Sequence, residues 1–202
     1  ILSLAGLWVA KTAGTAADLQ MRRALVRHVT DIAAAVNPAN LRALSFTAED
    51  KSRPEFSRLC SQLQAYAEFA GIDSLYTMAL RNGQIVFGPE SLSEGHPYSS
   101  PPGTVYQEPS QQDFDLFKTG RPQIQGPVSD EYGTFVTASA PVFDPVTGEV
   151  LAVVGLDVEA SRWKSVVGRA QWIPAGVTLV LLTVLFLGGL ILGRCRQKSI
   201  GH

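Results

Sequence analysis

Residues 134–159 predict two β-strands joined by a tight turn, and this hairpin constrains the fold more than any other stretch of the chain. Along each strand an apolar face alternates with a face of mixed polarity, because successive side chains of a strand point to opposite sides. A run this rich in β-branched residues indicates a central hairpin that is buried on both sides. The apolar face carries Val136, Ala138, Ala140, Val142, Val150, Ala152, Val154, Leu156 and Val158, and the mixed face carries Phe135, Thr137, Ser139, Pro141, Leu151, Val153, Gly155 and Asp157.

The turn of this hairpin is predicted at residues 144–148, Asp-Pro-Val-Thr-Gly. Proline fixes φ at the first corner, and Gly148 tolerates the positive φ that is needed where the second strand begins.

An uncharged run at residues 173–193 follows the hairpin closely. Its length of about 21 residues is enough for a helix to cross a hydrocarbon core roughly 30 Å thick. Arg194, Arg196 and Lys198 come directly after it, and positive residues flank membrane helices on the cytoplasmic side. The sequence therefore predicts a membrane helix at 173–193, a cytoplasmic stub at 194–202, and a domain at 12–172 on the periplasmic or extracellular side.

Length, charge and cysteine content further characterise the predicted domain outside the membrane. The chain has 202 residues, so the part outside the membrane run has the length of one ordinary domain. Its formal net charge of -1 gives no electrostatic reason to expect nucleic-acid binding. Cys60 and Cys195 are then on opposite sides of the membrane, which predicts no disulfide between them. We interpret Cys60 as a packing residue, and lipidation of Cys195 is a weaker alternative.

The chain begins with a mostly apolar run at residues 1–10, about half the length of a span. We interpret residues 1–11 as the outer end of a truncated first membrane helix. The alternative is a signal-peptide core that precedes the small residues Ala13, Gly14 and Ala16, although no basic segment comes before it.

Apolar residues then recur at helical spacing from Thr15 to Val36, which predicts a long amphipathic helix ending at Asn37-Pro38. Its basic cluster, which includes Arg22, is either a solvated face or a contact to lipid headgroups. A second helix is predicted to begin at a capping box formed by Ser52 and Glu55, and to end near Gly71. The apolar residues of the first helix are Leu19, Leu25, Val29, Ile32, Ala33 and Val36, and its basic cluster is Arg22, Arg23, Arg27 and His28.

The middle of the chain predicts the rest of the sheet. Asn82-Gly83 between two β-rich runs, 75–80 and 84–88, is a strong hairpin signal, and residues 123–128 predict a fifth strand after a short helix at 111–118. The fold class is therefore α+β: a five-stranded antiparallel sheet with the long N-terminal helix on its apolar face. The Pro-rich segment 89–109 is too long for a simple turn and covers the other face, either as a pocket wall or as a surface excursion.

The mixed face of the sheet is where we expect a ligand pocket. Asp157 ends an otherwise hydrophobic strand, so it either bonds nearby backbone amides or serves as an acceptor on a pocket floor. For Asp130 and Tyr132 the sequence likewise leaves two alternatives, a place in a turn or a place on the pocket rim. The predicted ligand-binding residues are Tyr76, Met78, Tyr98, Tyr106, Asp130, Tyr132, Thr137, Ser139 and Asp157.

Catalytic and metal-binding patterns are missing from the sequence. The three histidines show no HExxH spacing, and neither a phosphate-binding glycine loop nor a GxSxG elbow is present. We therefore expect no enzyme activity, metal or cofactor in this stretch.

Several segments together resemble the extracytoplasmic PAS-like sensor domains of the Cache superfamily. They are IDSLYTMALRNGQIVFG, SSPPGTVYQEP, FKTGRP and GPVSDEYGTFVTASAPVFDPVTGEVLAVVGLDVEA, and the resemblance covers Thr15 to Trp172. Such domains lie between membrane helices of bacterial receptors and hold a ligand between the sheet and the long loop. Asp157 matches an acid that often lines that pocket. No arginine here falls on a carboxylate-binding position, so the ligand class stays open.

The resemblance implies a sensor region of an inner-membrane signalling receptor that binds a small molecule of unknown identity. A histidine kinase is the favoured parent, with a diguanylate cyclase or chemoreceptor as alternatives. A homodimer through the long N-terminal helix and the membrane helices is also expected. The opposing hypothesis is a membrane-tethered module that binds protein and no small molecule.

Overall fold

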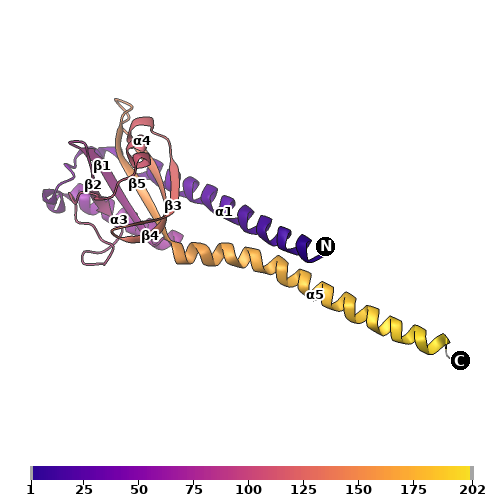
Figure 1. Cartoon of the computed structure of the whole chain (residues 1–202). Coiled ribbons are helices and arrows are strands. Elements are labelled where there is room, and N and C mark those ends of the chain that lie inside the picture. Colours follow the sequence, from indigo (N-terminus) through magenta and orange to yellow (C-terminus); the bar gives the residue numbers. More distant parts are fainter. Residues whose placement is uncertain (1, 201–202) are drawn as a thin grey trace. The chain divides into compact units, whose positions relative to one another are not determined.

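The computed structural model describes the backbone of residues 2–200 and the side chains of residues 6–173 and 176–189. The chain divides into two compact units, Met21–Trp163 and a second unit made of Ile1–Gln20 with Lys164–His202. Each unit is described by itself. The elements, drawn in Figure 1, are α1 (Leu2–Ala35), α2 (Pro38–Arg42), the 3-10 helix η1 (Ala48–Ser52), α3 (Pro54–Ala70), β1 (Ser74–Arg81), β2 (Gln84–Glu90), α4 (Gln111–Thr119), β3 (Gln123–Asp130), β4 (Gly133–Phe143), β5 (Val150–Glu159) and α5 (Ala160–Ile200).

The unit Met21–Trp163 is built on one five-stranded sheet with strand order β2-β1-β5-β4-β3. Every neighbouring pair is antiparallel, and the predicted hairpin β4–β5 occupies the middle. Asn82 and Gly83 both have positive φ, as the two-residue turn between β1 and β2 requires. The predicted fold class, an α+β PAS-like sheet with the long helix on one face, is confirmed.

The main core lies between one sheet face and three helices. Residues of α1, α2 and α3 pack on the apolar face of β4 and β5, and the alternation that the sequence shows places them there. Leu59, Leu63, Leu75 and Leu156 are fully buried, and burial of each such side chain stabilises the fold by about 1.5–3 kcal/mol. The opposite face carries a smaller cluster around Met78, Phe87 and Val153, which α4 covers through Leu116.

Two local predictions are wrong, and a third fails for one residue of the basic cluster. Ser52 does not cap α3, because it is the last residue of η1 and donates its hydroxyl to the Glu49 carbonyl instead. Val150 packs with the smaller cluster, because a register shift beside Phe143 turns the start of β5 over. Arg22 is not simply solvated: its guanidinium donates to the Gly126 carbonyl at 2.8 Å and lies over the Trp163 ring.

Helix α5 contains a stretch, Ala160–Gly189, that is long and apolar enough to cross a membrane by length and composition. None of its most apolar window is buried within the structure. The side chains of Arg194, Cys195, Arg196 and Lys198 lie outside the described residues, as does all of His202. The predicted boundaries at residues 11, 172 and 193 stay predictions.

Candidate functional site

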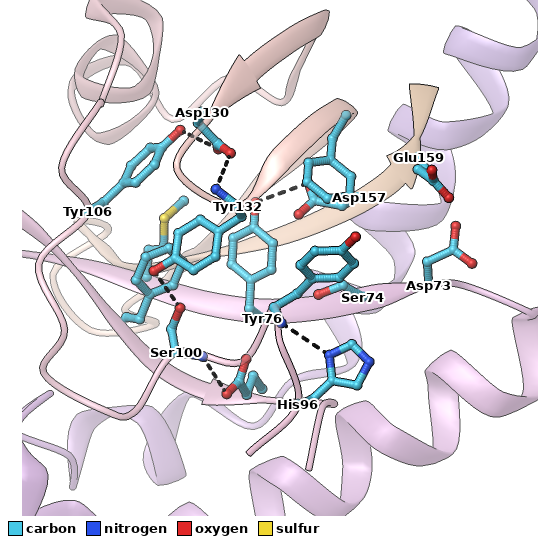
Figure 2. Close-up of a pocket in the computed structure, with 15 residues that line it drawn as sticks. Asp73, Ser74, Tyr76, His96, Ser100, Tyr106, Asp130, Tyr132, Asp157 and Glu159 are labelled. Carbon is cyan, nitrogen blue, oxygen red and sulfur yellow. Dashed lines mark hydrogen bonds between the residues drawn. The ribbon is translucent and has the colours of Figure 1, made fainter. Parts of the chain in front are cut away.

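A cavity of about 260 Å³ opens on the mixed face of the sheet, and we call it the sheet pocket (Figure 2). Its floor is formed by β1, β5 and the start of β4, and its walls come from β2, the loop 91–110 and the β3–β4 hairpin. Its lining residues are Asp73, Ser74, Tyr76, Met78, Phe87, Glu90, His96, Tyr98, Ser100, Tyr106, Asp130, Tyr132, Phe135, Asp157 and Glu159.

Asp157 lies on the floor of the sheet pocket. Its Oδ1 atom accepts hydrogen bonds from the Thr137 hydroxyl at 2.6 Å and from the Tyr76 hydroxyl at 3.2 Å. These donors come from the two strands that flank β5, where Thr137 and Ser74 are the register partners of Asp157. The residue keeps partial exposure through the cavity, but protein surrounds the carboxylate. Burial raises the pKa of Asp157 to about 7, although both hydrogen bonds act to lower it.

Tyr76 can reach Asp157 because its ring lies directly over Gly155. Any side chain at residue 155 would overlap the ring. Burial, followed by the nearby negative charge of Asp157, raises the pKa of the Tyr76 phenol well above its ordinary value. Tyr76 is therefore a neutral hydrogen-bond donor at physiological pH.

Aromatic rings form much of the wall. Phe87 of β2 is at the centre, with edge-to-face contacts to Tyr76, Tyr106 and Tyr132 at centroid distances of 5.5–5.7 Å. At the more exposed side, Tyr98 packs edge-to-face on Phe135. Such contacts hold rings in fixed orientations, so the wall is a preformed surface.

The loop 91–110 is fastened to the sheet at several points. Phe87 exchanges backbone hydrogen bonds with Gly103 and Thr104, and the Tyr106 amide donates to the Ile85 carbonyl. Glu90 accepts hydrogen bonds from the Ser99 hydroxyl and the Ser100 amide. Burial raises the pKa of the Glu90 carboxyl. The loop is thus paired along the outer edge of β2 and forms a wall of the pocket.

The β3–β4 hairpin closes the rim. Asp130 accepts hydrogen bonds from the backbone amides of Tyr132 and Gly133, so it shapes the turn. Its other oxygen accepts from the Tyr106 hydroxyl at 3.0 Å, and Ser100 donates to the Tyr132 hydroxyl at 2.8 Å. Asp130 therefore combines both roles that the sequence left open, a turn residue and a rim residue.

The structure brings the nine predicted residues together on one face. Seven line the sheet pocket: Tyr76, Met78, Tyr98, Tyr106, Asp130, Tyr132 and Asp157. Thr137 and Ser139 instead line an adjacent cavity of about 50 Å³ that shares Tyr76, Tyr106 and Asp130 with it. That any of them contacts a ligand stays a prediction.

Sequence reasoning missed eight lining residues. Glu159 could have been found, since it is two residues beyond Asp157 on the same strand and so faces the same side. Phe135 could have been found as well, since it is two residues before Thr137 on the same strand and so faces the same side. The remainder are Asp73, Ser74, Phe87, Glu90, His96 and Ser100, whose positions depend on strand register and on the loop path. Within the described residues, no group of three or more His, Cys, Asp or Glu side chains could hold a metal ion.

Comparisons with known proteins find similar solved structures only. No protein-family model and no curated protein sequence matches the chain. The ligand-binding domain of the Campylobacter jejuni chemoreceptor Tlp3 in complex with 4-methylisoleucine is 16% identical with a TM-score of 0.47, and the match covers 82% of this chain and 63% of that one. The sensory domain of the same chemoreceptor with isoleucine bound is 16% identical with a TM-score of 0.45, covering 82% and 62%.

A third similar structure is the extracellular domain of mmHK1S-Z2, described as a histidine kinase. It is 14% identical with a TM-score of 0.44, and the match covers 77% of this chain and 59% of that one. This chain therefore spans less than two thirds of the length of each of these solved domains. By their names, the first two are the ligand-binding and sensory domain of a chemoreceptor, and the third is the extracellular domain of a histidine kinase.

Proposed function

We propose that this chain is the extracytoplasmic small-molecule sensing region of a membrane-bound bacterial signalling receptor. The observation that carries the proposal is the sheet pocket, a cavity of about 260 Å³ with an aromatic wall and a buried acid on its floor. Enclosed apolar walls that exclude water, with a few polar atoms that fix orientation, are what a small ligand needs. Neither an enzyme nor a metal site is part of the proposal.

Chain connectivity supports a signalling role. Asp157 is on the last strand, and β5 ends at Glu159 where α5 begins at Ala160, so no loop separates the pocket floor from the helix that contains the candidate span. A ligand that binds one arrangement of the sheet more tightly than another would shift the population of that arrangement. Nearness along the chain offers a route for this shift and does not demonstrate coupling.

We favour a histidine kinase as the parent receptor, with a diguanylate cyclase or a chemoreceptor as alternatives. The receptor would be a homodimer, paired through α1 and the membrane helices, with its sensor unit outside the inner membrane and its C-terminus in the cytoplasm.

Thermal unfolding of the 202-residue chain in lipid nanodiscs tests the sensing function against a broad metabolite collection. A compound at 100 times its Kd stabilises the folded state by roughly 2.7 kcal/mol, which shows as a saturable rise in Tm. If no compound shifts the melting curve, the proposal fails, and a membrane-tethered module that binds protein becomes the better explanation.

A further inference from the structure

The charges around the sheet pocket are of one sign. Five carboxylates line it, from Asp73, Glu90, Asp130, Asp157 and Glu159, and the described lining residues include neither lysine nor arginine. Arg162 neutralises Asp73 from outside the lining at 2.8 Å. Asp73 and Glu159 lie toward the same edge of the pocket in Figure 2, and Asp157 lies further in. The remaining acids therefore favour a positive ligand group and disfavour a negative one.

Two phenol donors of the pocket are already directed at these acids. Tyr76 donates to Asp157, and Tyr106 donates to Asp130. The backbone amides of Tyr132 and Gly133 are used by Asp130 as well. A ligand carboxylate would thus meet several carboxylates, with no guanidinium or ammonium among the described lining residues to compensate for its lost hydration.

Asp157, by contrast, has acceptor capacity to spare. Both of its hydrogen bonds reach Oδ1, and among the described residues none donates to Oδ2. An ionised carboxylate accepts through both oxygens, so Oδ2 can take a hydrogen bond from a ligand N–H group.

The wall suits a cation for a second and independent reason. Six aromatic residues line the pocket, and the faces of such rings attract ammonium groups, more strongly where water is excluded. The rings are Tyr76, Phe87, Tyr98, Tyr106, Tyr132 and Phe135.

We propose that the sheet pocket binds a small organic cation that carries no carboxylate, with its ammonium group on Asp157 and its carbon skeleton against the aromatic wall around Phe87. This assignment rests on the proposed sensing function and names the ligand class of the same site.

Affinity for such a ligand depends on pH. The cation pairs with ionised Asp157, whose pKa burial raises to about 7, and the carboxylates of Asp73, Asp130 and Glu159 and the imidazole of His96 line the same cavity. Below neutral pH the ionised fraction of Asp157 falls, approaching about tenfold per pH unit, and the affinity falls with it.

The test uses probes that differ in charge and little else. The 202-residue chain in nanodiscs is melted with choline and its neutral isostere 3,3-dimethyl-1-butanol, with isobutylamine, isobutanol and L-valine, and with a wider set of protonated amines, each beside its alcohol and amino-acid counterparts. We expect at least one cation to raise Tm saturably, with no shift from its neutral or zwitterionic counterpart. We expect the Asp157→Asn variant to lose this shift, whereas Asp31→Asn, which neutralises an exposed acid on α1, keeps it.

The charge-matched probes need no variant, so the test stands even if Asp157→Asn folds poorly. If isobutanol, L-valine or any other uncharged or carboxylate-bearing compound binds as well as the cations, the ligand class is wrong while the sensing function stands. The ligand class is also wrong if a cation binds and Asp157→Asn, folded, binds it equally well. If no compound of any charge shifts the melting curve, the ligand class and the sensing function fail together.

Discussion

At the scale of single residues, Asp157 makes the stability of the domain depend on pH. Its folded-state pKa of about 7 lies above its ordinary value of 3.8, so between these values the folded state binds more protons than the unfolded chain. The free energy of unfolding therefore rises as pH falls through this window, by up to about 1.4 kcal/mol per pH unit, and the destabilising effect is complete above about pH 7.

Replacement by asparagine removes this effect. We expect Asp157→Asn without ligand to melt higher than the unmodified chain at about pH 8 and to approach it near about pH 5, because the asparagine oxygen still accepts from Thr137 and no charge is buried. The difference in Tm between variant and unmodified chain, followed over pH, measures this. Asp31→Asn is the matched control on an exposed acid. A difference that does not vary with pH would contradict the raised pKa.

Gly155 is predicted to set the position of Tyr76. In Gly155→Ala the added methyl group would overlap the ring, which also packs edge-to-face with Phe87, so we expect a loss of about 1–3 kcal/mol of stability. The hydrogen bond to Asp157 would also be lost, and the pKa of that carboxyl would rise further. Tyr76→Phe is the comparison: it removes the hydroxyl alone, so it should raise the Asp157 pKa with little steric effect. Carboxyl NMR titration and Tm give the two readouts, and an unchanged Asp157 pKa in both variants would exclude this role for the phenol.

The residue scale also shows where sequence reasoning stops. Alternation along β4 and β5 was enough to place Thr137 and Asp157 on one face, because the period of a strand is fixed by its geometry. Glu90 could not be placed this way, since a register shift in β1–β2 sets it opposite Tyr76. His96 and Ser100 depend on the path of the loop, which is fixed by backbone pairing with β2 and not by any local pattern.

At the scale of elements, the turn at residues 45–50 supports the loop that walls the pocket. The buried carboxylate of Asp50 accepts hydrogen bonds from the amides of Ser45 and Phe46. Phe46, held at a positive φ, packs beside Gly88 of β2, and the backbone of Thr47 lies against Gly103 of the loop. One acid therefore organises a connection that touches both the sheet edge and the loop.

Removal of this acid should be costly. We expect Asp50→Ala to lower the free energy of unfolding by about 2–4 kcal/mol, because at least two buried or half-buried amides lose their acceptor. Denaturant unfolding at fixed pH measures the loss. Glu49→Ala, at the exposed neighbouring position, is the control and should change stability little. Equal effects of the two substitutions would mean that the hydrogen bonds of Asp50 do not hold the turn.

Elements were easier to predict than the joints between them. The hairpin turns at Asn82-Gly83 and at residues 144–148 contain positions with positive φ, which few residue types other than Gly and Asn adopt readily. These turn residues therefore mark the turns in the sequence, and both strands of each hairpin could be located. The failed capping box has the opposite cause: the Ser52–Glu55 pattern fits a helix start, but η1 already uses the Ser52 hydroxyl for the Glu49 carbonyl. The 3-10 helix before α3 therefore decides where the Ser52 hydroxyl donates, and the spacing of Ser52 and Glu55 alone could not show this.

At the scale of the whole molecule, the proposal requires the sensor unit and the C-terminal residues to be on opposite sides of a membrane. The positive residues Arg194, Arg196 and Lys198 favour a cytoplasmic C-terminus. Ser129 is exposed at the end of β3, so a cysteine introduced there reports on the sensor side, and the native Cys195 reports on the other. Cys60 is a half-buried free thiol on α3 and must first be replaced by serine.

In the Cys60→Ser background, a membrane-impermeant maleimide applied to intact spheroplasts should label Ser129→Cys at once and Cys195 only after the membrane is permeabilised, because the reagent cannot cross the hydrocarbon core. The matched control is the Cys60→Ser chain without the Ser129 substitution, which should stay unlabelled from outside. Labelling of Cys195 in intact spheroplasts would reverse the topology and with it the extracytoplasmic placement of the pocket. If Cys195 reacts only after hydroxylamine treatment, it carries a thioester-linked lipid.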